Sequence, residues 1–291
     1  MADPKITLLS DAHYELGEGP VWNEAEQALY WTDINAKVIH RYDWRTKAFS
    51  EWRLPDICGS LGFRKDGSGV VAFRTSLNLF DFKTGKVGKQ LCDITEEHAH
   101  PQNRLNDGKI GPDGRYWVGS IDDRPVREPI AALYCIEADG SYRMVQDKLL
   151  GSNGLAWSPD GKTMYHSDTG VREAYAYDYD VKTGQATNRR LFYKFDETTG
   201  FPDGAAMDAE GYYWSAGVRG GRINRVSPAG KIERFVKTPM QFPTMPCFCG
   251  PDLTTIAVTS LDRGQGGDPE GGKIYLVEAG IKGMLGDRFA G

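Results

Sequence analysis

Short apolar runs alternate with glycine-rich turns along the whole chain. In five places a glycine opens an apolar run, an Asp-Gly type of turn follows, and a second apolar run completes the unit. These copies begin at Gly19, Gly59, Gly108, Gly154 and Gly204. A weaker sixth copy begins at Pro246, where the turn lacks its glycine. Because Asp-Gly supplies the positive φ angles of tight hairpins, each copy predicts strand, turn and strand.

A third apolar run follows most of the hairpins, and no segment keeps helical spacing over three turns. The third runs include VIHRYDW, LNLFDFKTG, ALYCIEADG, AYAYDYDVKTG and KIYLVEAG. The unit recurs about every 40 to 50 residues, the length of a four-stranded propeller blade. The pattern predicts an all-β fold, a six-bladed β-propeller that residues 1–291 form as a single domain. The N-terminal segment KITLLSDA is expected to complete the last blade and close the ring.

The innermost strand of each propeller blade lines the central channel, so equivalent positions of the six copies should converge there. The residue before the opening glycine is such a position. In the six copies, in order, this residue is Glu18, Cys58, Asp107, Asn153, Asp203 and roughly Met245. Carboxylates held together in a narrow channel repel one another unless a cation balances them. We therefore expect a central metal site. The competing interpretation is that these residues only form turns or caps, as Asp and Asn often do.

The candidate ligands Glu18, Asn153 and Asp203 offer hard oxygen atoms without a thiolate or an imidazole. This donor set favours Ca²⁺, Mg²⁺ or Mn²⁺ over a structural zinc site. One divalent cation is expected, and Zn²⁺ and Fe²⁺ remain open as its identity. An ion with three protein ligands keeps free coordination positions, so it could polarise a carbonyl oxygen or activate water.

Composition and charge narrow the range of partners. The chain is 40% hydrophobic and 26% charged, with a formal net charge of −5, and it has no basic block. Nucleic acid and membrane surfaces are therefore not expected as partners. No apolar stretch approaches the roughly 18 residues that span a bilayer. The five scattered cysteines lack paired CxxC spacing, which favours a reducing, cytoplasmic location over a disulfide framework. We expect a monomer or a small homo-oligomer.

Four longer segments carry a resemblance to a known family. They are LGEGPVW at 16–22, NRLNDGKIGPDGRYWVGS at 103–120, SNGLAWSPDGKTMYHSDT at 152–169 and PDGAAMDAEGYYWSA at 202–216. In this order they resemble the gluconolactonase family, also called the senescence marker protein or regucalcin family. The resemblance spans essentially the whole chain.

The resemblance implies a six-bladed propeller with Glu18, Asn153 and Asp203 as metal ligands. It also implies that Asp203 serves as general base and then as general acid. Asp107 lies outside the family's ligand set, so we expect it next to the ligands but not on the ion. Turn formation in the sequence LNDG is an equally good role for it.

The resemblance further implies that Arg104 and Asn106 bind the hydroxyl groups of a sugar lactone, since a guanidinium and an amide supply donors for a polyol. One position departs from the animal members. Where they carry an acidic substrate contact, counting along GSIDDRP places Arg124, preceded by Asp122 and Asp123. Arg124 is therefore a third candidate substrate contact, and the roles of these three residues in specificity are open.

The predicted function is metal-dependent hydrolysis of a sugar lactone, such as a pentono- or hexonolactone, to the free aldonic acid. The expected partner is this small molecule. Two alternatives use the same fold: a calcium-binding regulatory propeller, and an arylesterase or organophosphate hydrolase, which would require an apolar pocket. The sequence has no G-x-S-x-G or H-E-x-x-H motif, so serine-hydrolase and zincin chemistry are not indicated.

Overall fold

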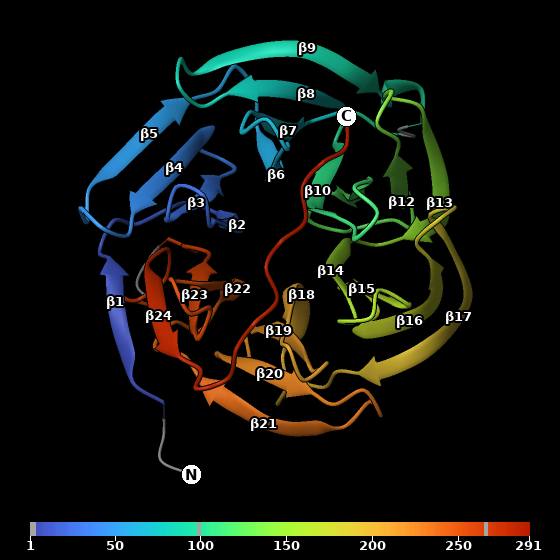
Figure 1. The fold of residues 1–291 in the computed structure, drawn as a ribbon. Helices are drawn as coiled ribbons and strands as arrows, with labels where there is room; N and C mark the ends of the chain where they lie inside the picture. Colours follow the sequence, from blue (N-terminus) through green and yellow to red (C-terminus); the bar gives the residue numbers. More distant parts are fainter. Residues whose placement is uncertain (1–3, 98–99, 265–266) are drawn as a thin grey trace.

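Six four-stranded antiparallel sheets stand around a common axis in the computed structural model, which describes residues 4–97, 100–264 and 267–291 (Figure 1). The predicted all-β, six-bladed propeller is confirmed. Within these ranges the helical structure is one turn of 3₁₀ helix, Thr95–Glu97. No helix of the described chain has the length and apolar character needed to cross a bilayer.

Five blades are built from four consecutive strands each, with the innermost strand first. Blade 1 contains β2 (Gly17–Asn23), β3 (Ala28–Asp33), β4 (Val38–Asp43) and β5 (Phe49–Arg53). Blade 2 contains β6 (Cys58–Phe63), β7 (Gly69–Phe73), β8 (Ser76–Asp81) and β9 (Lys86–Asp93). Blade 3 contains β10 (Asn103–Ile110), β11 (Tyr116–Asp122), β12 (Ala131–Ile136) and β13 (Tyr142–Leu149). Blade 4 contains β14 (Ser152–Trp157), β15 (Thr163–Asp168), β16 (Glu173–Asp180) and β17 (Gln185–Lys194). Blade 5 contains β18 (Phe201–Met207), β19 (Tyr213–Val218), β20 (Arg222–Val226) and β21 (Ile232–Lys237).

The sixth blade joins the two ends of the sequence. It contains β22 (Pro243–Cys249), β23 (Thr255–Ser260) and β24 (Ile274–Glu278), and β1 (Ile6–Ser10) is its outermost strand. β1 pairs antiparallel with β24, and Ile6 lies opposite Val277. The hairpin predicted from the degenerate sixth copy is therefore real, and the ring is closed by backbone hydrogen bonds between strands from opposite ends of the chain.

Pairs of tyrosine and tryptophan fill the spaces between neighbouring blades. Tyr30 and Trp31 are successive residues of β3, so their side chains point to opposite faces of the sheet. Tyr30 packs with Phe63 of blade 2, whereas Trp31 packs with Ala257 of blade 6. Equivalent pairs in blades 3 and 5 are also fully buried, so these side chains set the contact between blades.

Every innermost strand is interrupted by a β-bulge. The register of pairing shifts after Glu18 in β2 and after Asn153 in β14, and at corresponding points in the other four blades. Gly19 and Gly154 follow these two residues with φ angles of +54° and +67°. A bulge bends the strand and re-aims the side chains beside it. The opening glycines of the sequence repeat therefore mark the bulges.

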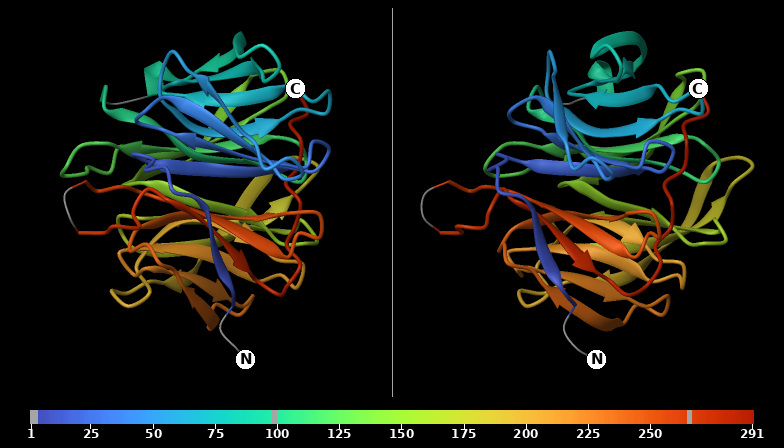
Figure 2. Two further views of the ribbon diagram at one scale, coloured as in Figure 1. Left: turned by 90° about the vertical axis from the view of Figure 1, so that its left-hand side faces the viewer. Right: turned by 60° about the vertical axis from the view of Figure 1, so that its left-hand side comes forward.

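The C-terminal segment 281–291 crosses one end of the propeller axis (Figure 1). The backbone N–H of Met284 donates to the carbonyl of Met207, and that of Phe289 donates to the carbonyl of Phe63. Phe289 is buried with 1% of its surface exposed. Figure 2 places this segment on one face and the connection after β23 on the opposite face. The segment thus covers one end of the axis.

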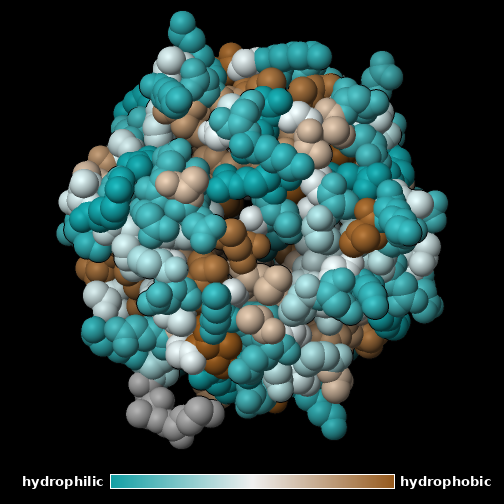
Figure 3. All heavy atoms as spheres, in the orientation of Figure 1, coloured by the Kyte–Doolittle hydropathy of each residue, from teal (hydrophilic) through white to brown (hydrophobic). Residues whose placement is uncertain are grey.

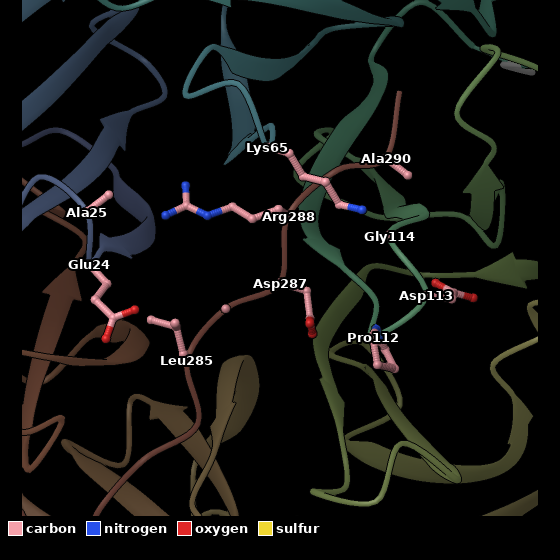
Figure 4. Close-up of a pocket in the computed structure, with 11 residues that line it drawn as sticks. Glu24, Ala25, Lys65, Pro112, Asp113, Gly114, Leu285, Asp287, Arg288 and Ala290 are labelled. Carbon is pink, nitrogen blue, oxygen red and sulfur yellow. The ribbon is translucent and has the colours of Figure 1, made fainter.

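Two cavities lie beside this covering segment. A cavity of about 260 Å³ lies behind it, lined by residues of the inner strands such as Trp22 and Met245. Apolar side chains gather near the middle of the same face (Figure 3). A second cavity of about 640 Å³ lies beside the segment, and Glu24, Lys65 and Arg288 project around it (Figure 4). Glu24 follows the last residue of β2, so the second cavity lies at the end of the axis opposite Glu18. The first cavity extends from the covering segment along the inner strands to Gly19, the residue after Glu18.

The bulge in β14 provides a test of the fold. A Cβ at Gly154 would approach Tyr213 Oη to 2.3 Å, whereas a Cβ at Gly280, which has nearly the same φ of +68°, meets nothing within 4 Å. Both alanine variants carry the cost of a positive φ, but only Gly154→Ala overpacks the core, which typically costs about 1–3 kcal/mol. We expect Gly154→Ala to melt about 2–5 °C below Gly280→Ala. Equal melting temperatures would show that the bulge tolerates a side chain.

Candidate active site

Glu18 and Asp203 come from the innermost strands of blades 1 and 5 and act on each other electrostatically. Glu18 is buried, and its Oε2 accepts a hydrogen bond from the backbone N–H of Gly19 at 3.0 Å. Burial and the nearby carboxylate of Asp203 raise the pKa of Glu18 well above its usual range. Burial and Asp107 raise the pKa of Asp203 to about 8. The two carboxyl groups are therefore poised to bind a proton or a cation more readily than they would in water.

A chain of hydrogen bonds connects blades 3 and 4 beside these carboxyl groups. Arg104 Nη1 donates to Asn106 Oδ1 at 2.8 Å, and Asn106 Nδ2 donates to Asn153 Oδ1 at 2.9 Å. Arg104 also lowers the pKa of both Glu18 and Asp203. The guanidinium, the two amides and the two carboxyl groups therefore belong to one cluster.

The side chain of Asn153 is oriented from its other end by Thr169. Asn153 Nδ2 donates to Thr169 Oγ1 at 2.7 Å, and this hydroxyl donates to the carbonyl of Pro202 at 2.8 Å. The amide oxygen of Asn153 accepts one hydrogen bond and keeps a second lone pair. Thr169, which the sequence analysis did not single out, thus fixes the direction in which this oxygen faces.

Asp107 lies beside the cluster and contacts the bulge of blade 4. Its Oδ2 accepts from the backbone N–H of Leu155 at 3.3 Å, and its Oδ1 is buried without a hydrogen bond to the described protein. Burial raises the pKa of Asp107, while the ammonium of Lys109 opposes this rise. Lys109 Nζ donates to the carbonyl of Ala205 at 2.6 Å. Asp107 therefore braces the strand segment that follows Asn153.

Arg124 is bound to an acidic side chain of its own loop. Its Nε and Nη2 contact Asp122 Oδ1 and Oδ2 at 2.8 and 2.7 Å, and Nη2 also contacts Glu128 Oε2 at 3.2 Å. This bidentate pair, with backbone N–H donors, holds the pKa of Asp122 well below its usual range. Asp123 instead accepts from Arg104 Nε at 2.6 Å. Among the described contacts, Arg124 touches none of the cluster, and its contact with substrate remains a prediction.

Arg127 is a basic residue near the cluster that the sequence analysis missed. Its guanidinium lowers the pKa of Asp203, and its Nε donates to the backbone carbonyl of Asp122 at 3.1 Å. The connection between β11 and β12 that carries it has no regular periodicity, so its position depends on the fold of the loop. The sequence shows that an arginine is present at this position, but it does not predict that the side chain lies near Asp203.

A buried serine and histidine pair lies close in sequence to Asn153. Ser152 Oγ and His166 Nε2 are 2.7 Å apart. Both residues have 0% exposure, and burial lowers the pKa of His166 to about 3. A Cβ at Gly119 would approach Ser152 Oγ to 1.7 Å, so the hydroxyl is packed against the neighbouring blade. Because both side chains are inaccessible to a substrate, we interpret this pair as a hydrogen bond that stabilises the core.

The donor atoms at the cluster suit a hard divalent cation. Glu18 and Asp203 supply carboxylates and Asn153 supplies an amide oxygen, a combination that Ca²⁺, Mg²⁺ and Mn²⁺ accept. Within the described ranges, no group of three His, Cys, Asp or Glu side chains could hold a metal, so a site here requires the amide of Asn153. Of the predicted site residues, six come together and Arg124 stands apart. The six are Glu18, Arg104, Asn106, Asp107, Asn153 and Asp203.

Comparisons with known proteins find relatives along the whole chain. The chain is 36% identical to regucalcin of Xenopus laevis, over 100% of both proteins. It is also 36% identical to a protein of Pseudomonas putida named 6-deoxy-6-sulfogluconolactonase, over 95% of each.

Solved structures agree with these relatives. A protein of Agrobacterium tumefaciens described as a calcium-binding regucalcin superposes with a TM-score of 0.91 and 25% identity, over 99% of this chain and 97% of the other. A luciferin-regenerating enzyme superposes with a TM-score of 0.88 and 30% identity, over 98% and 99% of the two chains. The family described as "SMP-30/Gluconolactonase/LRE-like region" matches residues 16–262. The chain belongs to this family.

Proposed function

We propose that the protein hydrolyses a sugar lactone to the free aldonic acid with the help of one divalent cation. The observation that carries this proposal is the meeting of Glu18, Asn153 and Asp203 with the Arg104–Asn106 pair at one end of the inner strands. The family and the relative of Pseudomonas putida named 6-deoxy-6-sulfogluconolactonase support lactone hydrolysis. Lactone opening needs an oriented carbonyl, a water and a proton acceptor, and the cluster offers a residue for each task.

Glu18, Asn153 and Asp203 would hold the cation. A divalent cation bound there supplies a Lewis acid that polarises the lactone carbonyl and favours the negative charge that develops on its oxygen. Thr169 and Asn106 fix the two ends of the Asn153 amide. Asp107 supports the bulge behind Asn153. Three side chains, those of Thr169, Asn106 and Asp107, therefore fix the position of the Asn153 amide oxygen.

Asp203 is the proposed general base and acid. A carboxyl group with a pKa raised toward neutrality accepts a proton better than an ordinary aspartate does, and burial raises the pKa of Asp203 in this way. The carboxylate takes a proton from the attacking water as the new C–O bond forms. It then returns this proton to the ring oxygen as the bond between that oxygen and the carbonyl carbon breaks, so the proton balance of the hydrolysis closes.

Arg104 is the proposed anchor for the sugar hydroxyls. Its Nε donates to Asp123, and its Nη1 donates to Asn106 and to the carbonyl of Leu105. Its Nη2 makes no hydrogen bond to the described protein, so two donors are free for a polyol. Both Nδ2 hydrogens of Asn106 are taken by Asn153 and the carbonyl of Ser152. Asn106 could therefore bind a substrate hydroxyl through its oxygen.

The second candidate is a calcium-binding regulatory propeller, which relatives named regucalcin and the solved calcium-binding protein favour. It would use the same oxygen ligands without turnover. A matrix of divalent metals against pentono- and hexonolactones, with a pH indicator to follow acid release, separates the two. An aryl ester or organophosphate substrate is less well supported, because the cluster around Arg104 is polar. All five cysteines are free thiols, in keeping with the proposed cytoplasmic location.

Asp203→Asn is expected to lower kcat by about 10²- to 10⁴-fold, because the amide keeps the shape of the side chain but cannot accept the proton. Asp160→Asn, in an exposed hairpin turn, is the matched control and should retain wild-type turnover. The rates should be measured at saturating metal. If Asp203→Asn regains wild-type turnover there, Asp203 is only a ligand.

Removal of metal by a chelator should lower the melting temperature of the wild-type protein. An ion present at 100 times its Kd stabilises the folded state by about 2.7 kcal/mol. Glu18→Gln removes one of two repelling carboxylates, so this variant should melt above the wild type without metal and gain less when metal is added. Glu24→Gln, beyond the other end of the same strand, is the control. A full metal-induced gain in Glu18→Gln would exclude Glu18 as a ligand.

A further inference from the structure

Three arginines from three neighbouring blades lie on connections at the end of the propeller that carries Asp203, and none of them has an acidic partner among the described residues. Arg127 lies between β11 and β12, Arg172 between β15 and β16, and Arg219 between β19 and β20. These connections all leave the same face of the propeller, the one that carries Asp203. Other arginines of the protein, such as Arg124 and Arg104, form ion pairs. Within the described ranges, these three form none.

Arg172 and Arg219 are held by an aromatic ring next to the cluster. The Cζ atoms of Arg172 and Arg219 lie 4.0 and 5.3 Å from the centroid of the Phe201 ring. Phe201 is the first residue of β18, two residues before Asp203. A guanidinium that rests on an aromatic face is oriented by it, while its N–H groups stay available at the ring's edge.

Arg127 is placed by the fold of its own loop. The carboxylate of Asp122 accepts from the backbone N–H groups of Arg124 and Glu128, at 3.1 and 2.8 Å. The loop is therefore tied down on both sides of Arg127. Nε of Arg127 donates to the carbonyl of Asp122, and Nη1 lies 3.4 Å from the position that a Cβ would occupy at Gly151.

The terminal nitrogens of Arg127 are consequently close to the start of β14, the strand that carries Asn153. They make no hydrogen bond to the described protein. Gly151 is also hydrogen-bonded to the residue that orients Asn153, because the backbone N–H of Thr169 donates to the carbonyl of Gly151 at 2.9 Å. The loop thus presents a fixed guanidinium, with free donors, at the edge of the site.

We propose that Arg127, together with Arg172 and Arg219, forms an anion site that selects sugar lactones bearing a sulfonate or phosphate group on the carbon remote from the carbonyl. This inference rests on the proposed lactonase function. Guanidinium forks match tetrahedral oxyanions and bind them with charge-assisted hydrogen bonds. A lactone whose carbonyl faces Glu18, Asn153 and Asp203 would direct its distant substituent to this rim.

The test compares kcat/KM for gluconolactone, its 6-phosphate and its 6-deoxy-6-sulfonate. The wild type should prefer at least one charged lactone by tenfold or more, and the preference should shrink as salt rises. Arg127→Gln should reduce the ratio of charged to neutral kcat/KM at least tenfold, and Arg127→Lys should restore part of it. Arg190→Gln, which removes an exposed arginine of β17, should leave the ratio unchanged. The preferred substrate identifies the oxyanion.

A binding measurement keeps this inference separable from the lactonase proposal. Calorimetry with gluconate, 6-phosphogluconate and 6-deoxy-6-sulfogluconate reports the anion site without turnover. If no lactone is hydrolysed but a charged aldonate binds more tightly than gluconate through Arg127, the lactonase proposal fails and the anion site stands. If the neutral lactone is hydrolysed and neither assay shows a preference for a charged compound, the anion site is overturned. An equal loss for charged and neutral lactones in Arg127→Gln also overturns it.

Discussion

The repulsion among the carboxyl groups of Glu18, Asp107 and Asp203 is the interaction on which the candidate site depends. Glu18 and Asp203 belong to different blades, yet the carboxylate of Asp203 raises the pKa of Glu18. Asp107 adds to the negative charge near both. A fold that only needed stability would place apolar residues here. Arg104 offsets part of the repulsion, and the remainder favours a divalent cation.

Most of the fold could be predicted from the sequence, because each blade repeats one pattern of strand, turn and strand. Even the degenerate copy at Pro246 forms the expected hairpin, β22 with β23. The bulges could not be predicted. Glycine is compatible with both a regular strand and a bulge, and only the register of the partner strand decides between them. The glycines after Glu18 and Asn153 therefore looked like strand openings, although they interrupt strands that have already begun.

The candidate site was predictable where its residues lie on repeated strand positions. Glu18, Asn153 and Asp203 follow from the repeat, and the structure brings all three into one cluster. Residues on loops were less predictable, since their direction depends on contacts that have no period. Counting along the chain selects Arg124 as a substrate contact, but its guanidinium is occupied by Asp122 and Glu128. In Arg127, three residues later, Nε is bound to the carbonyl of Asp122, while the two terminal nitrogens make no hydrogen bond to the described protein.

The loop between β11 and β12 has a consequence for how such an enzyme could diversify. It leaves and re-enters the sheet at adjacent strands, and its main anchor, Asp122, lies at its own base. Apart from Asp123, which binds Arg104, its residues could therefore change without moving the bulged inner strands that position Glu18, Asn153 and Asp203. The proposed recognition of the substrate's far end and the proposed activation of its carbonyl thus involve separate parts of the chain. Gene variation in the eight codons of residues 123–130 could therefore change the preferred substrate of the enzyme.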